Sequence, residues 1–307
     1  MGRLKLGSRL VPCYTPIGDF QCALLGSLLS EEELSLNIST GAQVSRLSSE
    51  LALGTHQTRP YFDGQSINTF SHAPGGRELN SLVSLVTSGL NVTDADRWAF
   101  IAAAMNATVK TDPEVLPSFL ETLPRMNEAI RNIRGDNLSV GHLFRATFED
   151  MAAIFFECAC SLWPERSWKK LVFSGGVAFK LGILREVIQA RFGAEYRLSP
   201  FPEDTLFGLL VLARAFSGIN RSVEEASNVL RLVSDQFKLY QERIPGYPRF
   251  DSRERRLSRT ADLLWSRSGR PSFIFGRFGF AGLLRAFLFM PTASTAVAMS
   301  LLLQSDS

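Results

Sequence analysis

The stretch that decides the fold runs Thr15-Pro-Ile-Gly-Asp-Phe-Gln-Cys-Ala-Leu-Leu-Gly26 and continues as Leu34-Ser-Leu-Asn-Ile-Ser-Thr-Gly-Ala-Gln-Val-Ser-Arg-Leu47. Asp19 lies in a glycine turn at the head of a predicted helix of small residues. The alternation from Leu34 predicts a strand that ends in the turn Ser39-Thr40-Gly41, after which the chain returns as the second strand of a hairpin. Such a pairing can place a proton-accepting carboxylate near a loop that holds phosphate, as phosphoryl transfer requires.

A second chemical signature follows later in the chain as a strand, a glycine turn and a helix. The strand is Lys170-Leu-Val-Phe, the turn is Ser174-Gly175-Gly176, and the predicted helix runs from Ala178 to Phe192. Glycines directly before a helix let a nucleotide approach backbone N–H groups, and the helix N-terminus favours phosphate oxygens. The alternative is a tight packing turn. The three-glycine spacing of the Rossmann fingerprint is absent.

Six short motifs occur in an order that points to one family. They are Gly18-Asp-Phe-Gln21, Asn37-Ile-Ser-Thr-Gly41, Arg59-Pro-Tyr-Phe-Asp-Gly64, Pro74-Gly-Gly-Arg77, Phe173-Ser-Gly-Gly176 and Glu203-Asp-Thr-Leu-Phe-Gly208. Together they resemble the C-terminal half of FGGY-type carbohydrate kinases, and among these the sedoheptulokinases most. The resemblance covers roughly residues 10–220.

The resemblance implies an α/β fold of the actin-like ATPase or ribonuclease-H-like type, with helices packed on a sheet, as one of the two domains of a sugar kinase. It implies that Asp19 is the general base that takes the proton of a sugar hydroxyl. The other implied contacts are Gly18 and Gln21 to the sugar, and Ser39, Thr40, Gly41, Gly175, Gly176, Val177 and Lys180 to the nucleotide. The family commonly has an Asn after the glycines, where this chain has Phe179 and Lys180.

Several of these residues have structural alternatives. Asp19 is a plausible N-cap of its helix, and Gln21 is equally well a surface amide. Arg59 and Arg77 are better explained as structural ion-pair partners than as substrate clamps.

The family's N-terminal half opens with an Asp-x-Gly-Thr/Ser loop, which is absent from these 307 residues. That loop positions Mg²⁺ and the terminal phosphates of ATP, and its half supplies most sugar contacts. We therefore expect an ATP- and Mg²⁺-dependent kinase of a ketose such as sedoheptulose, with a separate N-terminal half as partner for activity. The alternative is a non-catalytic remnant that binds a nucleotide or another chain.

Composition and charge place limits on the partners. With 45% apolar and 21% charged residues, the chain is typical of a globular protein. From Arg249 onward there are nine Arg and no Lys against four acidic residues, so the basic excess belongs to the tail and we expect no nucleic-acid partner. We predict a kinase domain over residues 1–245 and a poorly ordered tail over 246–307.

No membrane, metal or export signal stands out. The apolar run Ala286–Leu303 is long enough to span a membrane but contains Pro291 and polar residues, so an unstructured extension is the better interpretation. The four cysteines and three histidines are too scattered for a metal site. Met1–Val11 has no continuous apolar core, so we expect no signal peptide and a cytoplasmic protein.

The remaining pattern predicts mainly helices. We expect helices over 79–86, 94–106 (capped by Thr93 or Asp94), 140–163, 203–216 and 223–243, and a short strand near 197–198. The Pro- and Gly-rich segment 55–76 is predicted to be irregular, and 107–135 to be rich in loops.

Overall fold

A computed structural model of the protein describes residues 2–51, 53–89, 93–108, 114–116 and 129–243. The chain divides into two compact units, Met1–Gly208 and Leu209–Ser307, and each is described by itself. The predicted tail, 246–307, lies outside the described residues. The predicted boundary at residue 245 therefore stays a prediction.

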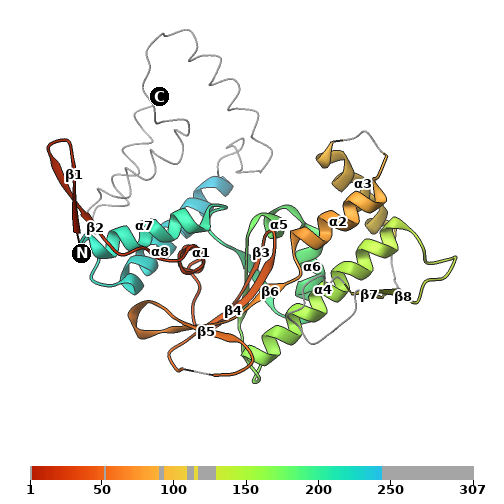
Figure 1. Cartoon of the computed structure of the whole chain (residues 1–307), viewed down its shortest axis with the longest axis horizontal. Helices are drawn as coiled ribbons and strands as arrows, with labels where there is room; N and C mark the ends of the chain where they lie inside the picture. Colours follow the sequence, from red (N-terminus) through yellow and green to blue (C-terminus); the bar gives the residue numbers. More distant parts are fainter. Residues whose placement is uncertain (1, 52, 90–92, 109–113, 117–128, 244–307) are drawn as a thin grey trace, which may run out of the picture. The chain divides into compact units, whose positions relative to one another are not determined.

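The first unit is built on a six-stranded mixed sheet with the order β10-β9-β3-β4-β6-β5. Figure 1 labels β3, β4, β5 and β6 of this sheet. The strands are β3 (Glu33–Ile38), β4 (Ala42–Ser48), β5 (Gln57–Pro60), β6 (Ser66–Ala73), β9 (Lys170–Ser174) and β10 (Glu195–Leu198). β10, β9 and β3 are parallel neighbours, whereas β4 is antiparallel to both β3 and β6. β6 therefore runs in the same direction as β3.

The sequence predicted the central hairpin but missed β5 and β6. β3 and β4 pair as expected, with Leu36 opposite Val44. The prediction that 55–76 is irregular was wrong, because the segment contains both β5 and β6. Its Pro and Gly clusters mark only the turns, and between them Ile67 and Thr69 are buried residues typical of a strand.

Helices pack on the sheet because alternate side chains of each strand point to opposite faces. Leu34, Leu36 and Ile38 of β3 enter the larger core, which also contains Phe144, Phe148 and Phe155 of α4 (Val140–Leu162). Val172 of β9 points to the other face, into a smaller core with Leu24 and Leu29. α1 (Asp19–Gly26) thus packs on the face opposite α4.

The other helices of this unit agree with the sequence pattern except at one place. They are α2 (Gly76–Val86), α3 (Asp94–Asn106), α5 (Gly176–Lys180), α6 (Gly182–Phe192) and the start of α7 (Asp204–Phe216). The Thr93 hydroxyl accepts a hydrogen bond from the Asp96 backbone and caps α3, as predicted. The single helix expected from Ala178 to Phe192 is wrong, because the helix breaks at Leu181, which has extended ψ.

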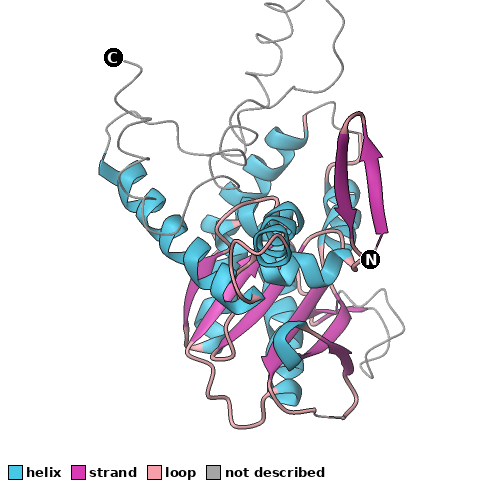
Figure 2. Ribbon diagram, turned by 90° about the vertical axis from the view of Figure 1, so that its left-hand side faces the viewer, coloured by secondary structure: helices cyan, strands magenta, loops and turns pink. Residues whose placement is uncertain are grey.

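Two short sheets complete the first unit. β1 (Gly2–Leu6) and β2 (Arg9–Cys13) form a separate hairpin (Figure 2), and β7 (Glu114–Leu116) pairs with β8 (Ala129–Arg131) inside the segment expected to be loop-rich. In the second unit, α7 continues and α8 (Val223–Arg243) follows, as predicted. There the buried Arg214 guanidinium donates to Asn220 Oδ1 at 2.9 Å.

Candidate functional site

The carboxyl ends of four strands meet at one edge of the sheet. β3, β6, β9 and β10 run in the same direction, so the loops that follow them gather there. These loops contain Ser39–Gly41, Pro74–Arg77, Gly175–Gly176 and Ser199–Glu203. In open α/β sheets, ligands characteristically bind outside the carboxyl ends of the strands.

The Ser-Thr-Gly turn is held by the loop that follows β6. The Gly76 N–H donates to Ser39 O at 2.7 Å, and the Arg77 N–H donates to Thr40 O at 2.9 Å. Within the turn, the Ser39 N–H donates to Gly41 O at 2.9 Å. The start of α2 is thereby fastened to the turn, and its first N–H groups lie beside it.

Close backbone contact explains the two glycines of this loop. A Cβ atom on Gly75 would lie 2.6 Å from the Gly41 carbonyl carbon, and one on Gly76 would lie 2.7 Å from Ser39 O. The buried Glu78 carboxylate accepts the Gly75 N–H at 2.7 Å. Side chains at either glycine would push the two loops apart.

Gly175 brings the third loop into contact with the end of β3. Its φ of 86° is in the region that favours glycine, and a Cβ there would lie 2.5 Å from Ile38 O. Parallel pairing of Asn37 with Ser174 produces this approach. The structure thus brings together the predicted Ser39–Gly41 and Gly175–Val177 segments, and adds Gly75–Gly76, whose Pro-Gly-Gly signal was visible in the sequence but assigned no contact.

Some positions in these loops leave space at the surface. Gly41 and Gly176 are exposed, and a Cβ on either would have no heavy atom within 4 Å. Thr40 is exposed as well, and Lys180 is an exposed residue in the last turn of α5. Val177 is half-buried, with Cγ2 3.0 Å from a Cβ placed on Gly76. The loops therefore contact one another through closely packed backbone, whereas the backbone at Gly41 and Gly176 is exposed.

Asp19 is exposed at the first helical position of α1. The N-cap residue is Gly18, so the alternative that Asp19 is the N-cap was wrong. Its Oδ1 atom accepts the Phe20 N–H at 2.8 Å, whereas Oδ2 accepts no hydrogen bond from the described residues. No hydrogen bond among those residues joins Asp19 to the glycine loops.

The side chain of Gln21 folds back over the turn before the helix. Its Oε1 atom lies where a Cβ of Gly18 would be, and the side chain is half-buried. Gly18 is extended, with φ −66° and ψ 140°. The amide therefore lies beside the turn that contains Asp19. This position fits both interpretations of Gln21, a sugar contact and a surface amide.

α1 is connected to the glycine loops through the first turn of α7. A Cβ on Gly26 would collide with the Asp204 carbonyl, and a Cβ on Gly208 would collide with the Cys22 carbonyl. The Asp204 side chain is buried, with 6% of its surface exposed. Asp204 had been noticed in the sequence only as part of an ordered motif.

The Asp204 carboxyl is a buried ionisable group. Burial, and to a smaller extent the charge of Glu203, raises the pKa of Asp204 to about 7, against the lowering effect of hydrogen bonds from the Ser199 hydroxyl and the Gly175 backbone. Its Oδ1 atom has no well-formed hydrogen bond among the described residues. A buried carboxyl with a raised pKa and an oxygen without a hydrogen bond is uncommon, and such groups are often found at functional sites.

Arg59 and Arg77, the two arginines of the sequence motifs, differ in their contacts. The Arg59 guanidinium donates to Gln57 Oε1 at 2.7 Å and lies 5.5 Å from the centre of the Phe20 ring, so it packs beside the start of α1. Arg77 is exposed, and its guanidinium makes no hydrogen bond or ion pair with described residues. The ion pair predicted for Arg77 is therefore not found among the described residues.

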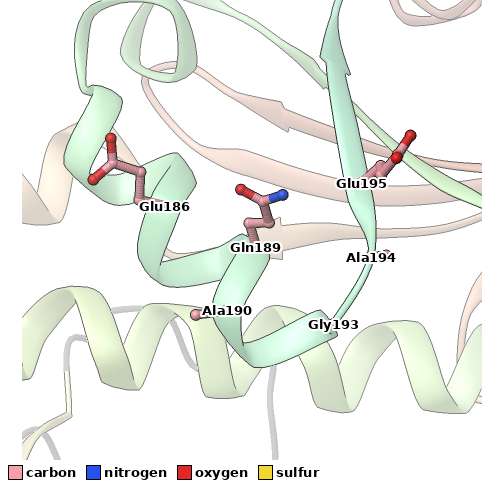
Figure 3. A pocket seen from close by; sticks show the side chains of 6 residues that line it. All are labelled: Glu186, Gln189, Ala190, Gly193, Ala194 and Glu195. Carbon is pink, nitrogen blue, oxygen red and sulfur yellow. The ribbon is translucent and has the colours of Figure 1, made fainter.

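A surface cavity of about 420 Å³ lies elsewhere, between the end of α6 and the start of β10. Figure 3 shows Glu186 and Gln189 on the helix and Glu195 on the strand. Because β10 begins at Glu195, this cavity lies at the amino ends of the parallel strands, opposite the glycine loops. Its two carboxylates make it unsuitable for phosphate.

No metal site accompanies the loops. Among the described residues, no group of three or more His, Cys, Asp or Glu side chains is arranged to hold an ion. The four cysteines are free, and burial raises the pKa of Cys158 to about 12. Cys158 is therefore an apolar core residue.

Comparison with known proteins gives structural relatives alone. No family model and no curated protein matches the sequence. Solved structures that match include xylulose kinase from Rhodospirillum rubrum, with a TM-score of 0.60, 15% identity, and coverage of 73% of this chain and 50% of that one. Plasmodium falciparum glycerol kinase with ADP has a TM-score of 0.57, 17% identity, and coverage of 75% and 51%. Xylulose kinase from Lactobacillus acidophilus has a TM-score of 0.56, 12% identity, and coverage of 72% and 49%.

These matches confirm the predicted fold class. The mixed sheet with packed helices is that of sugar kinase domains of the actin-like ATPase fold. This chain spans about half the length of the kinases that it matches. None of the helices in the described ranges is both long and apolar enough to cross a membrane.

Proposed function

We propose that this chain is the nucleotide-binding, base-carrying half of an ATP-dependent carbohydrate kinase, acting on a ketose such as sedoheptulose in the cytoplasm. The observation that carries the proposal is that three glycine loops meet at the carboxyl edge of the sheet. The backbone at Gly41 and Gly176 is exposed there and accessible to a ligand. The match to sugar and polyol kinase folds supports the same class of reaction.

In this proposal, the loops bind ATP through the backbone. Gly175 and Gly176 seat the adenosine part, since a side chain at Gly175 would separate β9 from β3. Thr40 and Gly41, which are both exposed, hold phosphate. Lys180 and Arg77 are exposed cations near these loops and offer charge to the phosphates.

Asp19 takes the proton of the attacking sugar hydroxyl. Because Oδ1 is held by the Phe20 N–H, the side chain is oriented while Oδ2 stays available. The proton moves to Oδ2 as the hydroxyl oxygen attacks the γ-phosphorus and the bond to the β-phosphate breaks. Gln21 and Gly18 line the sugar side of the same turn.

Mg²⁺ has no ligand set among the described residues. The residues present do not fit the ion, so we derive no step through it. A separate N-terminal half is the proposed source of metal positioning and of most sugar contacts, and the choice of sugar would depend on that half.

The test is ATP-dependent phosphorylation of sedoheptulose by the purified chain, alone and mixed with the polypeptide encoded directly upstream. Asp19→Asn should lower kcat by at least about 100-fold, the usual contribution of a general base, while ATP affinity stays within about twofold. A matched control is Asp136→Asn, which removes an exposed carboxylate that is paired with Arg134, at 3.3 Å.

The outcomes separate the candidate functions. Turnover that survives Asp19→Asn unchanged would contradict the role of the base. ATP binding without turnover on any ketose in either mixture would favour the non-catalytic remnant. No ATP binding at all would reject the kinase and a remnant that binds a nucleotide, and would leave only a remnant that binds another chain.

A further inference from the structure

We infer that the side-chain amides of Asn37 and Gln43 bind two adjacent hydroxyl groups of a ligand, at the carboxyl edge of the sheet and on the face where α1 packs. These two residues, the amide pair, have no role in the proposed function. The inference nevertheless rests on that function, because the hydroxyls belong either to the ribose of the nucleotide or to the sugar.

Strand pairing places three polar residues side by side at this edge. Asn37 of β3 is opposite Gln43 of β4 in the antiparallel hairpin, and opposite Ser174 of β9 in the parallel pair. Opposite residues of an antiparallel pair point to the same face, with Cβ atoms about 5 Å apart. The two amides are therefore neighbours, at a spacing that lets each contact one of two adjacent hydroxyl groups.

The two faces of the sheet differ at this edge. On the face that carries α4, Ile38 and Phe173 belong to the larger core and are completely buried. Side chains alternate along a strand, so Asn37 and Gln43 point to the opposite face, where Leu47 of β4 belongs to the smaller core. A ligand at the edge therefore meets closed apolar packing on one face, and two half-buried amides on the other.

Both amides have unused hydrogen-bonding capacity. Neither side chain makes a hydrogen bond with another residue in the part of the chain that the structure describes. The Asn37 Oδ1 atom lies 2.9 Å from the position of a Cβ on Gly175, so this oxygen adjoins the turn proposed for adenosine. Deeper in the sheet, by contrast, the hydroxyls of Ser45 and Thr69 bond each other at 2.8 Å. The amides at the edge are thus free to bind a ligand.

The chemistry of the row determines the class of ligand. An amide has both an N–H donor and a carbonyl acceptor, so it can pair with a hydroxyl in either direction. Asn37, Gln43 and Ser174 are all uncharged, which suits a neutral hydroxylated group better than a phosphate, since phosphates are bound most strongly by charged donors. The ribose of a nucleotide and the ketose both supply adjacent hydroxyls, so the experiment has an arm for each.

The first arm compares adenosine with 2′,3′-dideoxyadenosine, which lacks both ribose hydroxyls, by calorimetric titration of the full-length chain. The wild type should bind adenosine at least about fivefold more tightly than the dideoxy compound. Asn37→Ala should weaken adenosine binding about fivefold, the loss expected for one neutral hydrogen bond, and leave dideoxyadenosine binding within about twofold. An equal loss for both compounds would overturn the contact with the hydroxyls.

A second variant keeps the test valid if Asn37→Ala folds poorly, as its urea unfolding midpoint would show. Gln43→Ala removes the other amide from a different strand and should give the same selective loss. Ser35→Ala is the matched control, because this buried residue of β3 lies on the same face and its hydroxyl has no well-formed hydrogen bond among the described residues. The control should leave the preference for adenosine unchanged.

The second arm uses sedoheptulose, whose hydroxyls come from the sugar side. A selective loss for adenosine assigns the amide pair to the ribose, and a loss confined to sedoheptulose assigns it to the sugar. Unchanged affinity for both ligands in Asn37→Ala and Gln43→Ala overturns the inference and leaves the proposed function standing. A wild type that binds neither ligand rejects the inference together with the proposed nucleotide and sugar sites on which it rests.

Discussion

At the residue scale, Gly175 and Asp204 are the positions where small chemical changes have the largest expected effects. Gly175 combines a positive φ with backbone contact to β3, and Asp204 combines deep burial with an ionisable group. The glycine was identifiable in the sequence because Gly-Gly before a helix is a known turn pattern. The aspartate was not, because a single sequence does not reveal burial.

Gly175→Ala should destabilise the protein by about 2–3 kcal/mol, because the new methyl group adds backbone strain and approaches Ile38 O. The measurement is urea unfolding at neutral pH. Gly176→Ala is the matched control, since its Cβ has no neighbour within 4 Å and the residue is helical, and it should change stability by less than about 1 kcal/mol. Equal losses in both variants would contradict this reasoning.

Asp204→Asn should become progressively more stable than the wild type as the pH rises from 5 to 7. The pKa of Asp204 is raised in the folded state to about 7, so the folded chain favours the protonated form and loses stability as the pH rises from the ordinary value toward 7. The stability difference should grow by up to about 1.4 kcal/mol per pH unit and level off above pH 7. Urea unfolding from pH 5 to 8 measures it.

Asp136→Asn serves as the control for this titration, because Asp136 is 78% exposed in its side chain. A constant difference for Asp204→Asn would show that the carboxyl does not titrate there.

At the element scale, the important contact is that between α1 and the start of α7. Because Gly26 and Gly208 have no side chains, the backbones of α1 and α7 lie in contact. Each backbone occupies the space that a Cβ atom on the glycine of the other helix would need. Arg197 supports the end of α1 by donating to Ser27 O and Leu28 O, both at 2.9 Å. Asp19 therefore stands on a helix fixed at several points.

Gly26→Ala should cost about 2–3 kcal/mol, because its methyl group would overlap the Asp204 backbone and the helices would have to separate. Thermal unfolding of the full chain measures the loss. Gly182→Ala in α6 is the control, since its Cβ would meet only the flexible end of Arg185, at 3.6 Å, and it should be neutral or slightly stabilising. A neutral Gly26→Ala would mean that the helices are not in such close contact.

Sequence patterns predicted elements well where periodicity was strong and poorly where local signals conflicted. The alternation of Leu34, Leu36 and Ile38 gave β3 correctly, and the Thr93 cap gave the start of α3. β5 and β6 were missed because turn residues on either side dominated the pattern. β6 is stabilised by pairing with β4 and β5 by pairing with β6, and such pairing leaves no local mark in the sequence.

At the scale of the whole molecule, the proposed function predicts that ATP stabilises the chain. At an ATP concentration of 100 times Kd, the free energy of unfolding should rise by about 2.7 kcal/mol, because the ligand binds only the folded state. The melting temperature should therefore increase with ATP concentration. Gly175→Ala should show a smaller increase than the wild type at the same ATP concentration, and equal increases would place the nucleotide elsewhere.

The sequence by itself determined the turns and their order: an acidic glycine turn, a Ser-Thr-Gly hairpin and a Gly-Gly turn before a helix. These are local signals, since positive φ and tight turns restrict the residue at a single position. Only the tertiary structure decided that Gly75 and Gly76 pack on the Ser-Thr-Gly turn and that Gly175 packs against Ile38. Those contacts depend on the pairing of β4 with β6 and of β3 with β9, which places the carboxyl ends of β3, β6 and β9 at one edge of the sheet.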